Sequence, residues 1–487
     1  MTKRKKENKK KRMDEGEQNV GGYGETVHSR DFTSFDWFDE KVYQSEIADM
    51  ERKYIKPQSK DPYHFLIPAN KDYWTKLSST KIHGKLKVVK VDNAGAESIP
   101  STLTWSLVNH IYHAIWSSVI VKVNGNEFED TAALHYHRKV PLQIELNTSP
   151  SYRKNVLYHN NAYVPDDLGK ADVMDELTPY KAVDTNAPMA AFLKFEANDK
   201  YNSGFDRRRA GLQGGANVAF STNIYHDIMT CGKNWEPNTE FEIILHRNSD
   251  KLCIMQHKDD TNTYKIILDD IHLSYDIIAV TKQVETYHNT KIRTQTPHAR
   301  IKKNFMKYYI VPGNTPEFSR SNFFYTTKNT LPEQIIILVM EQDRWLGKKG
   351  LNPYNYKPVE FTEIGLFING KQTPYPFLSN IDEAGKIKLY DHFLENTGYG
   401  NAAQSGVEIP ISYERYNDNC FMIAFDRTAA KHNGFYDTLP DSGFIDIHLK
   451  LETAKTENYV VCVYASYSEE MKIDGQRITT QPIQTRK

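Results

Sequence analysis

The chain has 487 residues, of which 39% are hydrophobic and 12% aromatic, with 30 tyrosines. This composition excludes a disordered chain and is typical of a globular, β-rich protein, and the length allows two or three domains. No run of eighteen apolar residues occurs, and the first thirty positions lack the apolar core of a secretion signal, so we expect a soluble intracellular protein. The four cysteines show no CxxC spacing, which favours free thiols over a disulfide framework.

The formal net charge is zero, but the charges are unevenly distributed. Residues 1–12, called the basic arm below, contain one acid and eight basic side chains: Lys3, Arg4, Lys5, Lys6, Lys9, Lys10, Lys11 and Arg12. Of 62 basic and 62 acidic residues in the whole chain, 54 and 61 lie outside the arm, so the remainder is about seven units negative. Basic blocks of this kind act as nuclear-localisation signals, nucleic-acid contacts or attachments to anionic surfaces, or simply aid solubility, and these roles stay open.

Two different segments follow the basic arm. Residues 13–31 are polar and contain four glycines, which predicts a flexible tether. Between Phe32 and Lys56, apolar residues recur at intervals of three and four, which predicts an amphipathic helix: Trp37, Phe38, Val42, Tyr43 and Ile47. Such a helix packs against its own body, a neighbouring subunit or a membrane surface.

From Tyr63 onward, short runs of β-branched and aromatic residues are separated by turn residues, the pattern of an all-β sandwich. The predicted strands of the first half are 64–68, 84–91, 118–123, 142–146, 241–246 and 264–280, the last as one or two strands. A helix is predicted just before the strand at 118, because Val108, Ile111, Tyr112 and Ile115 share a helical face. Residues 147–235 form a predicted long excursion, and loops of that length are generally functional or mobile.

Residues 281–303 are polar and rich in Thr, Lys and Arg, which predicts a connector, and a second set of strands begins near Asn304. These predicted strands are 307–311, 334–340, 363–368, 420–425, 444–451 and 459–467. Residues 344–356 and 377–412 are predicted loops, the second with a short helix near 390–394.

The two sets of strands share landmarks in the same order. Three segment pairs match, at offsets of 244, 245 and 203 positions: 65–70 with 309–314, 119–125 with 364–370, and 237–245 with 440–449. The second pair is a strand that runs into Asn-Gly, a strong hairpin signal because a type I′ turn needs positive φ at both central positions. A repeat this long predicts two similar domains, the first with about forty extra residues between its second and third landmarks.

No recognisable catalytic or cofactor motif stands out. His135-Tyr136-His137 puts two imidazoles on one side of a predicted strand, but no carboxylate or cysteine follows at a spacing useful for a metal. The glycine-rich segment 211–215 lacks both the GK[ST] ending of a P-loop and the GxGxxG of a dinucleotide site. No GxSxG is present. We therefore expect a structural or binding protein without cofactor, metal or catalytic residues, and not an enzyme.

Two local stretches carry a resemblance to double jelly-roll major capsid proteins. Residues 105–125 (WSLVNHIYHAIWSSVIVKVNG) resemble a stretch of the capsid proteins of Polinton/Maverick elements and adintoviruses, which begins at N-x-x-x-H and ends in a strand and N-G. The loop 352–356 (NPYNY), followed by 361–370 (FTEIGLFING), looks like its counterpart in the second half. The resemblance covers about 62–473, and its specificity comes from the order and joint presence of individually loose motifs.

The resemblance implies an all-β fold of two tandem eight-stranded jelly rolls with short helices in the loops. The expected division is a basic arm with an amphipathic segment (1–60), a first jelly roll with a long insertion (61–285), a connector (286–303), and a second jelly roll with a C-terminal tail (304–487). The insertions at 147–235 and 344–412 are expected to form an outer tower and contacts between subunits.

The resemblance also implies a function. A hexon-like major capsid protein forms homotrimers, which are the pseudo-hexagonal capsomers of an icosahedral shell around double-stranded DNA. The implied partners are further copies of the chain, penton and minor capsid proteins, and genome DNA or an internal membrane through the basic arm. The implied location is the virion capsid, with the host nucleus or cytoplasm during assembly. The alternative is a tandem β-sandwich protein that binds a ligand such as a carbohydrate.

Overall fold

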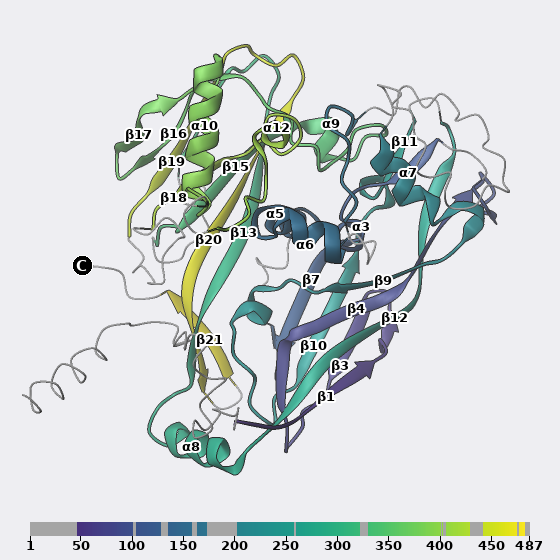
Figure 1. Ribbon diagram of the computed structural model, residues 1–487, viewed down its shortest axis with the longest axis vertical. Helices are drawn as coiled ribbons and strands as arrows, with labels where there is room; N and C mark the ends of the chain where they lie inside the picture. Colours follow the sequence, from purple (N-terminus) through teal and green to yellow (C-terminus); the bar gives the residue numbers. More distant parts are fainter. Residues whose placement is uncertain are drawn as a thin grey trace, which may run out of the picture.

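The computed structural model describes residues 46–100, 104–127, 135–157, 163–172, 202–257, 260–321, 330–400, 402, 406–428, 442–474 and 477–482. Figure 1 shows two β-sheet bodies side by side, with one helix, α5 (Tyr136–Asn147), between them. The first body lies at the lower right and the second at the upper left. The basic arm and residues 32–45 of the predicted amphipathic helix lie outside the described residues.

The first body consists of two main antiparallel sheets. One has the order β1 (Ile47–Ile55), β12 (Thr263–Val280), β4 (Trp74–Val91), with β9 (Val218–Asn223) and β5 (Glu97–Ser98) both paired to β4. The other has the order β2 (Ser59–Lys60), β3 (Tyr63–Ile67), β10 (Phe241–Arg247), β7 (Trp116–Val123), β8 (Asn126–Glu127). A small separate sheet pairs β6 (Trp105–Leu107) with β11 (Ile254–Gln256).

The second body repeats this arrangement. One sheet has the order β13 (His298–Val311), β20 (Tyr459–Asp474), β15 (Gln334–Glu341), β18 (Ile423–Asp426), with β21 (Arg477–Pro482) paired to β20. The other has the order β14 (Glu317–Ser321), β19 (Ile445–Leu451), β16 (Phe361–Ile368), β17 (Lys371–Leu378).

The two bodies have the same strand connectivity. In chain order, the strands β1, β3, β4, β7, β8, β9, β10 and β12 correspond to β13, β14, β15, β16, β17, β18, β19 and β20, with the same neighbours in each sheet. Eight described strands in two facing four-stranded sheets, with this order of pairing, make a jelly roll. The expected fold class, two tandem eight-stranded jelly rolls with helices in the loops, is therefore confirmed.

The helices lie in the connections between strands. Besides α5 they are α3 (Ile111–Ala114), α6 (Pro150–Tyr152), α7 (Ser203–Ala210), α8 (Lys282–Ile292), α9 (Gln342–Trp345), α10 (Glu383–Asn396) and α12 (Tyr413–Tyr416). A π-helical turn spans Arg153–Leu157, and 3₁₀ turns span Gln213–Gly215, Asp227–Thr230 and Asp250–Leu252. None of the helices in the described part of the chain has the length and apolar character that crossing a bilayer requires.

The hairpin turns agree with the prediction from Asn-Gly. Asn124 and Gly125 have φ of 50° and 74°, and Asn369 and Gly370 have φ of 50° and 76°. These values belong to type I′ turns, and each turn joins an equivalent pair of strands, β7 to β8 and β16 to β17. The second landmark pair is thus structurally equivalent, and so is the third, which leads into β10 and β19.

The first landmark pair was wrong. Residues 65–70 belong to β3 and the loop after it, whereas 309–314 belong to the end of β13, which is the counterpart of β1. Both segments are an apolar strand end followed by proline, so the match reflects similar local chemistry at two different places in the roll.

Residues 142–146 were predicted as a strand but lie in helix α5, as do Tyr136 and His137. The reason is that α5 is buried on two sides. Tyr136, Val140 and Ile144 contribute to the core of the first roll, whereas Leu142 and Leu146 contribute to the core of the second. With apolar residues on opposite faces, a helix loses the one-sided period by which it is recognised and resembles a strand.

The predicted helix at 32–56 is also wrong where it can be compared. Ile47–Ile55 is strand β1, which pairs antiparallel with β12 along nearly its whole length, from Ile55 opposite Leu273 to Ile47 opposite Val280. The predicted connector contains helix α8, and strand β13 already begins at His298. All four cysteines are free, as expected.

Candidate assembly surfaces and the junction between the rolls

Glu145 is the centre of a buried charge cluster where the two rolls meet. It lies at the end of α5, and its carboxylate accepts hydrogen bonds from Arg153 and from Arg415 of the second roll, the latter at 2.8 Å. His110 Nε2 lies 3.0 Å from the same carboxylate. Burial raises the pKa of Glu145, but the guanidinium groups of Arg415 and Arg153 outweigh it and hold that pKa below its usual range. Glu145 therefore stays ionised, and its carboxylate binds Arg415 of the second roll.

Two further arginines cross the junction. Arg138 on α5 donates to the backbone carbonyls of Trp345, at 2.7 Å, and Pro353, both in the second roll, and its guanidinium stacks over the Trp345 ring at 4.7 Å. Arg344 of the second roll binds Asp172 of the first through both guanidinium nitrogens, at 2.5 and 2.9 Å. Each guanidinium is nearly inaccessible to water, so the relative position of the rolls is fixed by hydrogen bonds that are costly to leave unmade.

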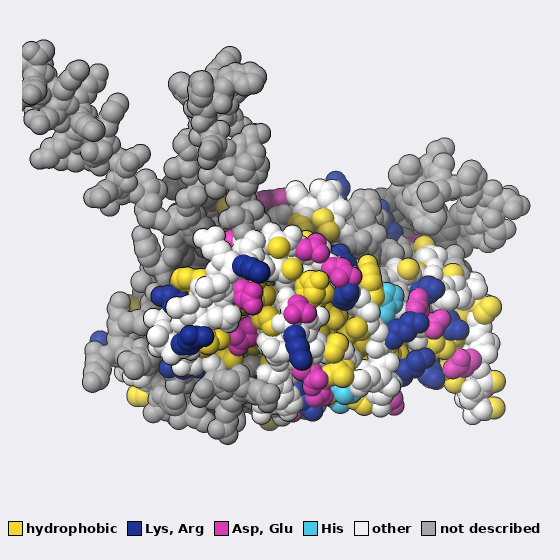
Figure 2. All heavy atoms as spheres, turned by 90° about the horizontal axis from the view of Figure 1, so that it is seen from below, with side chains coloured by type: hydrophobic (Ala, Val, Ile, Leu, Met, Phe, Trp, Pro, Cys, Tyr) yellow, Lys and Arg dark blue, Asp and Glu magenta, His cyan; other side chains and the backbone are white. Residues whose placement is uncertain are grey.

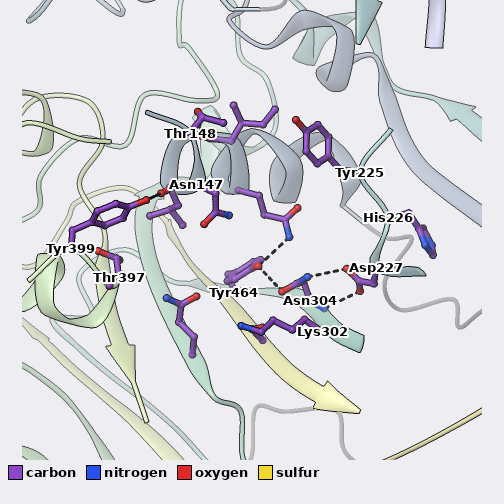
Figure 3. A pocket seen from close by; sticks show the side chains of 16 residues that line it. Asn147, Thr148, Tyr225, His226, Asp227, Lys302, Asn304, Thr397, Tyr399 and Tyr464 are labelled. Atoms are coloured by element: carbon purple, nitrogen blue, oxygen red, sulfur yellow. Dashed lines mark hydrogen bonds between the residues drawn. The ribbon is translucent and has the colours of Figure 1, made fainter. Parts of the chain in front are cut away.

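A polar cavity of about 560 Å³ lies beside α5, between it and strands β13 and β20. Figure 3 shows Tyr464 pointing into this space, where its hydroxyl donates to Asn304 at 2.7 Å and accepts from Gln143 of α5 at 3.1 Å. Asn304 in turn donates through its backbone and side-chain nitrogens to Asp227, each at 2.9 Å. The hydrogen bonds join α5 and the turn at 227–230 of the first roll to the sheet of the second.

This cavity lacks the features of a catalytic centre. His226 lines it, and burial lowers the pKa of that imidazole to about 4, so it is neutral at physiological pH. Its neighbour Asp227 is engaged by Asn304. No cysteine lies among the described lining residues, and the described part of the chain contains no group of three or more His, Cys, Asp or Glu arranged for a metal ion. The side chains here connect elements and do not converge on a reacting atom.

The residues singled out from the sequence are placed as follows. The eight cations of the basic arm lie outside the described residues. His135 and His137 lie at the start of α5, with ring centroids 6.2 Å apart, and His135 also contacts Tyr308 at 5.5 Å. They are part of the aromatic packing near the junction, and burial lowers the pKa of both.

Sequence reasoning missed the junction residues Arg138, Glu145 and Arg415. A single Glu or Arg in a chain rich in charge gives no sign that it is buried, because burial depends on contacts between segments far apart in the sequence. Glu145 and Arg415, for example, are separated by 270 positions.

No protein-family model matches the chain. An uncharacterized protein of Caenorhabditis elegans, F54H12.2, is 19% identical over 432 residues, which cover 86% of this chain and 93% of that protein.

Among solved structures, a chain of the Sputnik virophage, determined by cryo-EM, matches with a TM-score of 0.57 and 9% identity, over 95% of this chain and 93% of the other. The mavirus major capsid protein matches with a TM-score of 0.49 and 11% identity, over 96% and 98% of the two chains. The likeness to the virophage chain spans both rolls and their junction, and so the chain has the double jelly-roll fold over nearly its whole length.

Proposed function

We propose that the chain is a major capsid protein whose homotrimers form the pseudo-hexagonal capsomers of an icosahedral double-stranded DNA virus or virus-like element. The observation that carries this proposal is the pair of equivalent eight-stranded rolls locked together by a buried junction. The same two-roll fold occurs in a chain of the Sputnik virophage structure. The resemblance of residues 105–125 and 361–370 to capsid proteins of Polinton/Maverick elements supports the same role.

Two rolls in one chain suit a hexagonal building block. Three copies around a threefold axis present six rolls of the same connectivity, so each capsomer meets its neighbours through six similar faces. A closed ring of three uses a head-to-tail contact and stops growing once the rotation closes. The facing sheets and the loops of each roll also protect most strand edges from uncontrolled pairing.

The proposed division follows the expected one, with a basic arm and amphipathic segment (1–60), a first roll (61–285), a connector (286–303) and a second roll (304–487). We assign the partner contacts in the same terms: the basic arm binds genome DNA, an internal membrane or a minor capsid protein inside the shell, and penton proteins fill the vertices. Assembly takes place in the host nucleus or cytoplasm, and the role of the chain is structural, not enzymatic.

The test is the assembly state of the purified full-length chain. Sedimentation equilibrium should give three times the 56.3-kDa chain mass, and negative-stain images should show pseudo-hexagonal particles. A chain that stays monomeric at all concentrations and binds glycans on an array would refute the proposal and support the carbohydrate-binding alternative.

A further inference from the structure

Each roll has one sheet whose outer face points away from the facing sheet of the same roll: the sheet of β1, β12, β4 and β9 in the first roll, and that of β13, β20, β15 and β18 in the second. This outer face is covered in the second roll and open in the first. In the second roll this face includes Asn304, Met306, Tyr464 and Ser466, all of them at most 9% exposed. The first roll covers it with α5, from which Gln143 donates to Tyr464 and Lys139 donates to the carbonyl of Asn304. The helix comes from the connection between β8 and β9.

The corresponding face of the first roll is open. It is formed by β1, β12 and β4, where Tyr54 is 64% exposed and lies beside the stacked rings of His83 and His272, each with its centroid 6.2 Å from that of Tyr54. Figure 2, seen from below, shows Lys and Arg side chains interspersed with acids over the right-hand part of the molecule, where the first roll lies. Because the two rolls are equivalent, an open face here corresponds to a contact that the single chain leaves unmade.

A row of basic side chains follows β4 across this open face. Lys81, Lys85 and Lys87 share one side of the strand, since alternate residues of a strand point the same way, while Ile82 and Leu86 point into the core. Lys85 lies 3.8 Å from Asp270, and among the described residues neither Lys81 nor Lys87 lies within 4.0 Å of a carboxylate. We call these three lysines the basic row.

Helix α10 of the second roll carries a matching acidic row. It occupies the connection between β17 and β18, the counterpart of the connection that holds α5. Leu389 and Phe393 bury its inner side in the core. The outer side of the helix exposes four residues at intervals of four, Glu383, Ile387, Asp391 and Glu395, and with them Lys388. The carboxylate of Glu383 also accepts a hydrogen bond from Tyr413 at 2.7 Å. We call the four residues at intervals of four the acidic row; Ile387, 48% exposed, is its apolar member.

The two rows agree in length, charge and position. The helix from Glu383 to Glu395 rises over twelve residue steps, about 18 Å, and the strand from Lys81 to Lys87 over six steps, about 20 Å. In a contact between two copies, three carboxylates would face three ammonium groups, and Ile387 would meet the exposed ring of Tyr54 beside them. Figure 1 places α10 and the sheet of β1, β12 and β4 at opposite ends of the molecule, as a head-to-tail contact between copies requires.

We propose that α10 of one copy docks through its acidic row on the basic row of the next copy, and repeats between chains the contact that α5 makes within a chain. This inference rests on the proposed function, because it takes the second copy to be the next subunit of the trimer. The contact is polar, so it weakens as salt screens the charges.

Charge reversal tests the pairing in the full-length chain. One variant reverses the basic row (K81E/K85E/K87E), a second reverses the acidic row (E383K/D391K/E395K), and a third combines both sets. A matched control reverses three exposed lysines elsewhere (K71E/K251E/K371E). Circular dichroism and thermal unfolding first establish that each variant is folded, and sedimentation velocity then gives the fraction of trimer at several salt concentrations.

The expected result is that each single set weakens trimer formation at least about 100-fold, because like charges then face each other, while the combined variant and the control form trimers. The proposal is overturned if the variant with the reversed basic row or the variant with the reversed acidic row still forms trimers. It is also overturned if both of these variants lose the trimer and the combined variant does not regain it. A wild-type chain that never forms trimers refutes the proposed function itself, which separates the two failures.

Discussion

At the scale of the residue, Glu145 is the buried charge on which the junction depends. The change Glu145→Gln keeps the side-chain shape but leaves the guanidinium groups of Arg153 and Arg415 without a counter-charge. Breaking a buried pair in this way costs about 3–5 kcal/mol of unfolding free energy. Urea unfolding monitored by fluorescence measures it. The exposed Glu51→Gln on β1, which removes only a surface contact to Lys53, should change stability by less than about 0.5 kcal/mol, and equal effects of the two changes would contradict the assignment.

The same junction predicts how stability depends on pH. In the folded chain the pKa of Glu145 and the pKa of Asp172 are both held below their usual range, the second because Arg344 and Lys357 outweigh burial. Carboxylates with a lowered folded pKa contribute stability that is present above the unfolded pKa, about 4, and is lost as the pH falls below it. The unfolding free energy should already fall as the pH drops below about 6.5, because buried neutral histidines such as His226 and His113 have lowered folded pKa values. The two carboxylates should add a further decline below pH 4.5. The decline should be shallower in Glu145→Gln, and an identical acid slope would show that the carboxylate is not involved.

At the scale of the element, α5 belongs to both rolls at once. Leu142 is fully buried in the core of the second roll although its helix follows a strand of the first. We expect Leu142→Ala to cost about 2–5 kcal/mol through lost contacts and the cavity left behind. The matched control is Leu346→Ala, because that leucine is 59% exposed and should lose little. Denaturant unfolding gives both values, and a small effect at Leu142 would mean that α5 is not an essential bridge.

Strands with a regular apolar pattern were predictable, whether alternating as in β10 or continuous as in the buried β15, and helix α5 and strand β1 were not. The strands β7, β10 and β16 and the two Asn-Gly turns follow from alternation and from turn chemistry, which are local properties. Helix α5 was read as a strand because its apolar residues face two cores. Strand β1 was read as a helix because its exposed sequence, IADMERKYI, alternates weakly and is fixed by pairing to β12, more than two hundred positions away.

The candidate site shows the same division. The basic row could have been found in the sequence, since Lys81, Lys85 and Lys87 alternate with apolar residues from Ile82 to Val88 and therefore share a strand face. The sequence could not show that this face is open, because α5 covers the corresponding face of the second roll and not this one, and that choice depends on how the two rolls pack together. The junction arginines could not be found either, since their burial arises only when both rolls are folded against each other.

At the scale of the whole molecule, the charge is divided between an arm and a body of opposite sign. The arm carries eight cations and one acid, and the remaining chain is about seven units negative. A body of that charge repels DNA overall, although a local cluster such as the basic row carries the opposite sign. If the chain binds the genome, the interaction energy must come mainly from the arm.

Binding of full-length chain to a short DNA duplex should therefore be steeply salt-dependent. Up to eight phosphate contacts per arm give a slope of about −7 in log affinity against log salt. Removal of residues 1–12 should abolish most of the binding, and a full-length variant with the eight cations replaced by glutamine should behave like the truncated chain, since charge and not length carries the contact. Fluorescence anisotropy at several salt concentrations measures all three proteins, and sedimentation should show that each still forms trimers. If the truncated chain kept its affinity, the DNA contact would have to lie on the body, where the basic row is the first place to examine.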